Sequence, residues 1–146
     1  MNTVLEAQPP VRLVLYIEEN KSCFELVEEL LARRNDVRLM HCRSGIEGLA
    51  MAVLHMPAVI MLDLHLRDIT SMDALCQLQS NPLTTNIPVM GLSSNASPKQ
   101  ITNGLDSGFF RYVPKPFQFS EFLGALESCL SSASSQTYLK GDKSRP

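Results

Sequence analysis

Blocks of apolar residues alternate with polar, helix-compatible segments along the chain, and this pattern predicts alternating strands and helices. Short, almost wholly apolar runs between turn-forming residues are typical of strands that are covered on both faces. These runs are residues 11–17, 37–42, 58–63, 87–92 and 109–113. Between them, apolar residues recur at the spacing of an amphipathic helix. The predicted helices are residues 21–34, 44–55, 72–79, 98–107 and 121–130.

The order of these elements predicts an α/β fold with a doubly wound sheet. Each strand is followed by a helix, and each crossover is long enough for a right-handed connection between parallel strands. The sheet should therefore be parallel, with helices on both faces. One domain is expected, over residues 11–131. Residues 1–10 are predicted to be a disordered lead-in, and the serine-rich residues 132–146 a disordered tail.

Composition narrows the class of protein. A chain of 146 residues with 45% hydrophobic and 19% charged residues has the size and balance of one globular domain. Its apolar runs are shorter than the roughly 18 residues that a membrane span needs, and its start does not resemble a secretion signal. A formal charge of −2 gives no reason to expect nucleic-acid binding. Cys23, Cys42, Cys76 and Cys129 show no CxxC pairing, so we expect buried free thiols in a reducing cytoplasm.

Polar side chains follow the predicted strands at the point where each strand ends. Glu18 and Glu19 end the first, Asp63 the third and Ser93 the fourth, and Lys115 follows the fifth. The carboxyl ends of parallel strands lie at one edge of the sheet, so these side chains should converge. Neighbouring carboxylates favour a divalent cation, and Mg²⁺ suits them because it binds one or two carboxylates and leaves room for a phosphate. Asp63 could then act as a nucleophile toward phosphorus, while Lys115 and Ser93 bind the phosphoryl oxygens.

Four motifs in this order resemble the receiver domain of two-component response regulators: Glu18-Glu19, LDLHL around Asp63, GLSSNA around Ser93 and YVPKPF around Lys115. The resemblance covers residues 11 to about 131. It implies a flavodoxin-like, five-stranded sheet of strand order 2-1-3-4-5 with five helices. It further implies a stand-alone signalling protein, similar to chemotaxis regulators, that is not an enzyme.

The resemblance also implies the role of each site residue. A histidine kinase or phosphotransfer protein would phosphorylate Asp63, with Ser93 and Lys115 contacting the phosphoryl group. Mg²⁺ would be the cofactor. Its implied ligands are Glu18, Glu19, Asp63 and the main-chain carbonyl of His65.

A change at the surface would transmit the signal. Tyr112 is the implied switch residue, and it would fill space that the Ser93 hydroxyl vacates. The face formed by the fourth helix, fifth strand and fifth helix would then bind a downstream effector protein or a second copy. The Lys115–Pro116 peptide bond is a candidate for the cis form.

Three positions depart from the family pattern. Glu19 stands where the family usually has Asp, Arg67 where it usually has Pro, and Ser71 where it usually has Gly. Whether they weaken metal binding or phosphorylation stays open at this point, and Ser71 would be strained if its φ had to be positive. His65 lies close enough to Asp63 for us to hypothesise an influence on water attack at the phosphoaspartate.

Three alternatives remain beside a phosphorylated receiver. The nearest is a degenerate receiver that acts as an interaction module without phosphate. A flavodoxin-like FMN binder would need a phosphate-cradling loop after the first strand, where this chain has two glutamates. A hydrolase of the haloacid-dehalogenase type should carry a second Asp two residues after Asp63, where this chain has His65.

Overall fold

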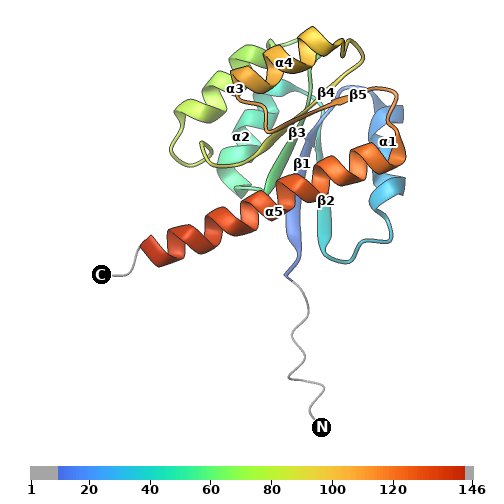
Figure 1. The fold of residues 1–146 in the computed structure, drawn as a ribbon. Coiled ribbons are helices and arrows are strands. Elements are labelled where there is room, and N and C mark those ends of the chain that lie inside the picture. Colours follow the sequence, from blue (N-terminus) through green and yellow to red (C-terminus); the bar gives the residue numbers. More distant parts are fainter. Residues whose placement is uncertain (1–9, 144–146) are drawn as a thin grey trace.

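The computed structural model describes the backbone of residues 10–143 and the side chains of residues 10–133. The predicted lead-in therefore lies outside the described residues except for Pro10. The described part is an α/β fold in which one parallel sheet lies between helices (Figure 1).

The sheet has five parallel strands in the order β2-β1-β3-β4-β5, which confirms the predicted fold class and strand order (Figure 1). The central strand β3 is buried at every position, as expected for an apolar run covered on both faces. The strands are β1 (Arg12–Ile17), β2 (Val37–Cys42), β3 (Val59–Asp63), β4 (Val89–Ser93) and β5 (Arg111–Pro114).

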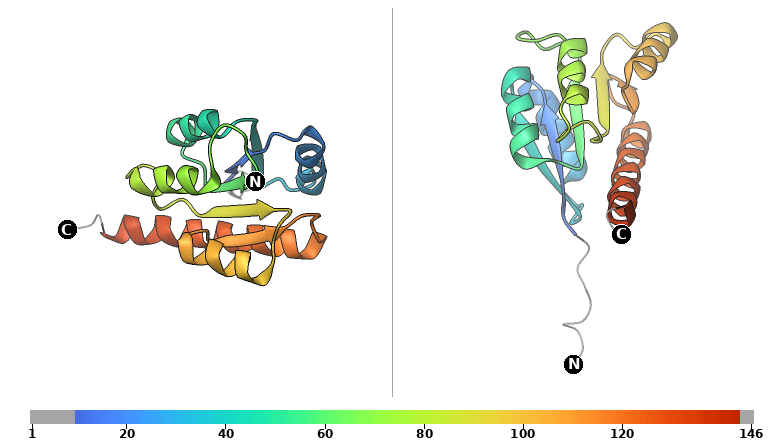
Figure 2. Two further views of the ribbon diagram at one scale, coloured as in Figure 1. Left: turned by 90° about the horizontal axis from the view of Figure 1, so that it is seen from above. Right: turned by 90° about the vertical axis from the view of Figure 1, so that its left-hand side faces the viewer.

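Helices cover both faces of this sheet, and α5 lies on the opposite side from α2 and α3 (Figure 2). Successive side chains of a strand point to opposite faces. Val14 and Tyr16 of β1 accordingly belong to the core cluster shared with α1 and α5, whereas Leu15 and Ile17 belong to the cluster shared with α2 and α3. The helices are α1 (Lys21–Leu31), α2 (Gly45–His55), α3 (Ser71–Ser80), α4 (Pro98–Ser107) and α5 (Phe119–Lys143).

The last helix is longer than predicted. The sequence predicts its end at Leu130 and a disordered tail from residue 132, whereas α5 continues to Lys143. Serine lowers helix propensity only modestly, and no proline occurs between Pro116 and Pro146 to stop the helix. Residues 144–146 lie outside the described part.

The cysteines are only partly as expected. All four are free thiols, and Cys42 and Cys129 are buried. Cys23 is half-buried, and the prediction that Cys76 is buried is wrong. Cys76 follows Leu75 on α3, and it is Leu75 and Leu78 that point into the core. Within residues 10–143, no helix is both long and apolar enough to cross a membrane.

Candidate phosphoacceptor site

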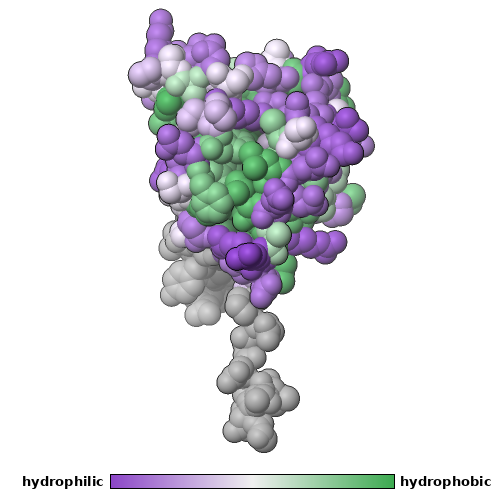
Figure 3. Space-filling model, turned by 90° about the vertical axis from the view of Figure 1, so that its right-hand side faces the viewer, coloured by the Kyte–Doolittle hydropathy of each residue, from purple (hydrophilic) through white to green (hydrophobic). Residues whose placement is uncertain are grey.

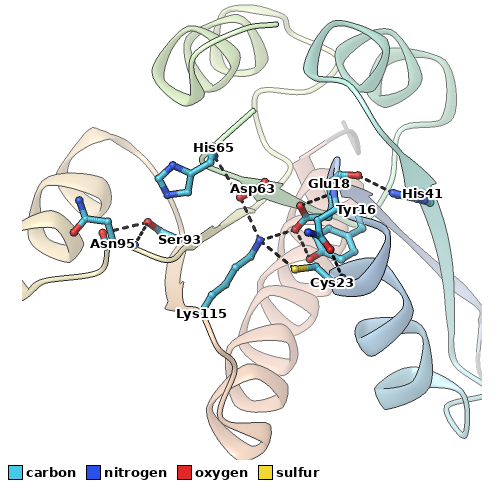
Figure 4. A network of polar contacts seen from close by, with 10 residues as sticks. Tyr16, Glu18, Cys23, His41, Asp63, His65, Ser93, Asn95 and Lys115 are labelled. Atoms are coloured by element: carbon cyan, nitrogen blue, oxygen red, sulfur yellow. Dashed lines mark hydrogen bonds and ion pairs between the residues drawn. The ribbon is translucent and has the colours of Figure 1, made fainter. Parts of the chain in front are cut away.

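The carboxyl ends of the strands gather the polar side chains at one edge of the sheet (Figure 4). Asp63 is the last residue of β3 and Ser93 the last of β4, while Glu18 directly follows β1 and Lys115 directly follows β5. Asp63, Glu18 and Lys115 line one cleft of about 590 Å³. The lining is completed by Glu19, Asn20, Lys21, Cys23, His65, Arg67 and Ser94.

The Lys115 ammonium joins the two buried carboxylates of the cleft. Its Nζ donates to Glu18 Oε1 at 2.6 Å and to Asp63 Oδ1 at 3.3 Å (Figure 4). Glu18 is 1% exposed and Asp63 is 5% exposed. Charges removed from water to this extent are tolerated only when they are paired, so Lys115 is the internal counterion of the site. The peptide bond between Lys115 and Pro116 is cis, as predicted.

The site shifts the pKa values of these three charged groups in different directions. Burial raises the pKa of Asp63, and the neighbouring Glu18 raises it further. Burial also opposes ionisation of Glu18, but hydrogen bonds from Lys115 and from the Asn20 main-chain N–H hold its pKa below the ordinary value. Burial alone would lower the pKa of Lys115. The hydrogen bond to Glu18 raises it, and the pKa of Lys115 is raised overall. Asp63 is therefore the carboxylate that gains most from an added cation or from modification.

Glu18 is held by more donors than the sequence indicated. The Tyr16 hydroxyl donates to Glu18 Oε1 at 2.9 Å, and the Asn20 main-chain N–H donates to Oε2 at 3.1 Å. Burial raises the pKa of Tyr16, so its hydroxyl keeps the proton that it donates. His41 Nε2 lies 2.8 Å from the Glu18 carbonyl oxygen, and the His41 ring stacks on Phe24. Tyr16 was not among the predicted site residues, although a hydroxyl in an apolar run two residues before the acidic pair was a visible signal.

Among the carboxylates that line the cleft, Glu19 is the one paired with Arg67. Its Oε2 accepts from the Arg67 main-chain N–H at 3.3 Å, and its Oε1 lies 3.5 Å from Arg67 Nε. In the part of the chain that the structure describes, no three His, Cys, Asp or Glu side chains are grouped to hold a metal. Glu18, Glu19 and Asp63 all line the cleft, but Glu19 is paired with Arg67 and the three carboxylates are not grouped closely enough to form a ready-made metal site.

The remaining oxygen donors still suit a magnesium ion. Glu18 and Asp63 supply two carboxylates in one cleft that His65 also lines, and the His65 main-chain N–H donates to Asp63 Oδ1 at 3.3 Å. Mg²⁺ is commonly held by one or two carboxylates together with several waters. The donor set therefore fits the ion without a third carboxylate.

The Ser93 hydroxyl faces the loop that leads to α4. Its Oγ accepts from the Asn95 main-chain N–H at 3.0 Å and donates to the Asn95 carbonyl oxygen at 3.1 Å (Figure 4). Ser93 is only 2% exposed. Both of these bonds are local, so a ligand bound to Asp63 would have to compete with Asn95 for the hydroxyl.

The Tyr112 ring packs against α4 at Gly104, where the helix carries no side chain. A Cβ on Gly104 would collide with the Tyr112 ring, so the ring occupies space that only glycine leaves open. The ring also meets Phe109 edge to face, with ring centroids 6.0 Å apart. Tyr112 is half-buried, and Gly91 of β4 is its register partner, two residues before Ser93.

The loop after Asp63 takes a path that accommodates the unusual residues. Ser71 is the first residue of α3, after the cap Thr70, and Met56 is the only non-glycine residue with positive φ among the described residues. Ser71 is therefore unstrained. Asp68 accepts from the main-chain N–H groups of Gly45 and Ile46, so this loop also caps the start of α2.

A doubly wound sheet with buried carboxylates and a lysine at its carboxyl edge is the arrangement of a receiver-type signalling domain. The profile of the family described as "Response regulator receiver domain" matches residues 14–127. The chain therefore belongs to the response regulator receiver domain family, the signalling domains of two-component systems.

Curated relatives match over very different shares of their own length. The polar-differentiation response regulator DivK of Brucella ovis is 24% identical over 120 residues, which are 82% of this chain and 97% of DivK. The DNA-binding dual master transcriptional regulator RpaA of Synechocystis is 35% identical over 86 residues, 59% of this chain and 36% of RpaA. Histidine kinase P4 of Formosa agariphila is 27% identical over 109 residues, 75% of this chain and 8% of that protein. The chain thus spans nearly all of DivK but only a minor part of the other two.

Solved structures share the fold at low sequence identity. The chemotaxis response regulator CheY4 of Vibrio cholerae superposes with a TM-score of 0.74 at 22% identity, covering 82% of this chain and 99% of CheY4. The receiver domain of the sensor histidine kinase PA1611 of Pseudomonas aeruginosa gives a TM-score of 0.73 at 22% identity, covering 83% and 98%. That receiver was solved with a magnesium ion coordinated in its active-site cleft.

Proposed function

We propose that this protein accepts a phosphoryl group on Asp63 from a histidine kinase or a phosphotransfer protein. The observation that carries the proposal is the buried Asp63 carboxylate at a cleft, paired with the Lys115 ammonium. An Asp63 oxygen would form a bond to phosphorus as the bond from phosphorus to the donor's histidine nitrogen breaks. The donor histidine would leave as neutral imidazole after its ring has taken up a proton from water, and Lys115 would balance the added negative charge.

Mg²⁺ is the proposed cofactor of this transfer, and the magnesium-bound receiver of PA1611 supports the assignment. Glu18, Asp63 and the His65 main-chain carbonyl would hold it, and Glu19 would join them only after leaving Arg67. When bound, the ion would supply positive charge that screens the carboxylates from the incoming phosphoryl group.

The proposed output is a change of the surface formed by α4, β5 and α5. The phosphoryl group would offer the Ser93 hydroxyl a charged acceptor in place of the Asn95 main chain. Tyr112 would then leave its place against Gly104, and the surface would change its affinity for an effector protein or a second copy. The phosphoryl group acts here as a ligand that shifts two existing states.

An apolar surface near the cleft supports the proposal that a protein partner binds there. Hydrophobic side chains gather on the side of the molecule where α1 and the start of α5 lie, flanked by hydrophilic residues (Figure 3). Phe24, Leu30 and Leu123 of these helices are half-buried, and Leu26 is 43% exposed. Asn20, Lys21 and Cys23 at the beginning of α1 line the cleft. We propose that the phosphodonor protein docks on this side, in the cytoplasm, where the four free thiols would stay reduced.

The second candidate function is a receiver that binds partners without being phosphorylated. The pairing of Glu19 with Arg67 favours it, because one predicted metal ligand of the cleft is already engaged by a protein cation.

Intact mass decides between the two candidates. The purified protein is incubated with Mg²⁺ and acetyl phosphate beside an Asp63→Asn control. A gain of one phosphoryl group by the wild type alone supports phosphorylation at Asp63. If the wild type gains no mass while an active receiver gains it under the same conditions, the phosphoacceptor proposal fails and the interaction module takes its place.

A further inference from the structure

The hydroxyl of Tyr16 is a buried polar group at the floor of the site. Tyr16 lies on β1, is 0% exposed, and donates to Glu18 Oε1. A buried hydroxyl without a partner costs free energy, so this one is useful to the fold only while Glu18 stays where it is. This hydrogen bond therefore favours one relative position of the Tyr16 hydroxyl and the Glu18 carboxylate.

The two donors to Glu18 Oε1 differ in rigidity. Lys115 ends a flexible four-carbon chain, and its ammonium would be repelled by any cation that enters beside Glu18. The Tyr16 ring is enclosed by the core cluster, with ring centroids 6.2 Å from Phe24 and 6.5 Å from His41. When a cation displaces Lys115, the Tyr16 hydroxyl remains as the side-chain donor that holds Oε1.

Glu18 needs such a support more than an aspartate would. The glutamate side chain has one more rotatable bond, and the Asn20 main-chain N–H restrains only its other oxygen, Oε2. With both oxygens restrained, the carboxylate plane is set before the ion arrives, and the ordering cost of binding is smaller.

We propose that Tyr16 is a positioning residue that holds the Glu18 carboxylate in the orientation in which it binds the divalent cation. The inference rests on the proposed function of the cleft as a magnesium site. Hydrogen-bonded neighbours of metal ligands typically contribute about 10-fold to 100-fold in metal affinity. Tyr16 belongs at the lower end of that range, because the ion keeps other ligands.

Calorimetric titration of the unphosphorylated protein with Mg²⁺ tests this directly, with Tyr16→Phe against wild type. We expect the Tyr16→Phe protein to bind Mg²⁺ about 10-fold more weakly. The Mg²⁺ concentration that gives half the maximal rate of mass gain from acetyl phosphate should rise by about the same factor, while the maximal rate changes less than about threefold. The matched control is Thr84→Val, which also removes one buried hydroxyl, bonded to the Leu78 carbonyl, and should leave the Mg²⁺ affinity unchanged.

A double-mutant cycle separates positioning from a general effect on the fold. In a Glu18→Asp background the carboxylate is one methylene shorter and withdraws from Tyr16, so adding Tyr16→Phe should change Mg²⁺ affinity by less than about twofold. The proposal is overturned by a Tyr16→Phe affinity within twofold of wild type, by an equal effect in both backgrounds, or by a wild type that binds no Mg²⁺. A Tyr16→Phe protein that is unfolded by circular dichroism would overturn it as well, because the hydroxyl would then serve the fold alone.

This measurement can fail independently of the proposed phosphorylation. Calorimetry needs no phosphoryl transfer, so a weaker Mg²⁺ affinity of Tyr16→Phe in a protein that never gains mass would support the role of Tyr16 and reject the phosphoacceptor proposal.

Discussion

Replacing Lys115 by methionine should destabilise the metal-free protein, and the size of the loss should depend on pH. Methionine keeps much of the side-chain volume but removes the ammonium that bridges Glu18 and Asp63. Both carboxylates are almost wholly buried. Without Lys115 they face each other uncompensated, which is the arrangement that proteins tolerate least.

The size of the stability loss can be worked out from the distances between Lys115 and the two carboxylates and from the cost of protonating Asp63 instead. At an effective dielectric constant of about 20, contacts of 2.6 Å and 3.3 Å correspond to attractions of roughly 6 and 5 kcal/mol, largely offset by the desolvation of the three groups. In the variant, Asp63 can escape the repulsion by taking up a proton, which at about pH 7.5 costs roughly 5 kcal/mol for an ordinary carboxyl group. The loss of unfolding free energy cannot exceed this cost. Since the cleft admits water, we expect a loss of about 2–3 kcal/mol at that pH. At about pH 5.5 the cost of protonation falls to roughly 2 kcal/mol and the expected loss to about 1 kcal/mol.

Urea unfolding followed by circular dichroism in EDTA measures these losses. The control compares Asp63→Asn with the Asp63→Asn, Lys115→Met double variant, in which only one buried carboxylate is left unpaired. The loss on removing Lys115 should then shrink by more than half, and adding Mg²⁺ to the single variant should recover stability. A loss below about 0.5 kcal/mol, or the same loss at both pH values, would show that Lys115 is not the counterion of the site.

Three further predictions concern neighbouring parts of the fold. Asp63→Asn should stabilise the metal-free protein by roughly 1 kcal/mol at neutral pH. Because the folded-state pKa of Asp63 is raised, wild type loses stability as Asp63 ionises, so this advantage should disappear in urea unfolding near pH 3. Asp68→Ala removes an acceptor that caps α2. Because Asp68 is exposed, the free energy of unfolding should fall by only about 0.5 kcal/mol near pH 7. The main-chain donors of α2 lower the pKa of Asp68, so that cost should fade as acid protonates it, and an equal cost at pH 3 would contradict the capping role. Gly104→Ala should push the Tyr112 ring off α4 and cost about 1–2 kcal/mol, and a crystal structure with Tyr112 unmoved would reject this.

Much of the site follows from the sequence because parallel strands place their carboxyl ends together. The apolar run that ends on Asp63 predicts a buried central strand, and β3 is buried throughout. Once the strands are known, Glu18 and Lys115 must lie near Asp63, whatever their separation along the chain. The cis bond at Lys115–Pro116 also followed from the resemblance in sequence, and the structure contains it.

The orientation of individual side chains was decided only by tertiary packing. Glu19 is paired with Arg67, which lies 48 residues later in the chain. Ser93 turns toward Asn95, and Tyr16 reaches Glu18 from inside the sheet. A sequence pattern records where a strand ends and which face a residue occupies. Which of several partners a long polar side chain takes depends on contacts between distant segments, and these exist only in the folded chain.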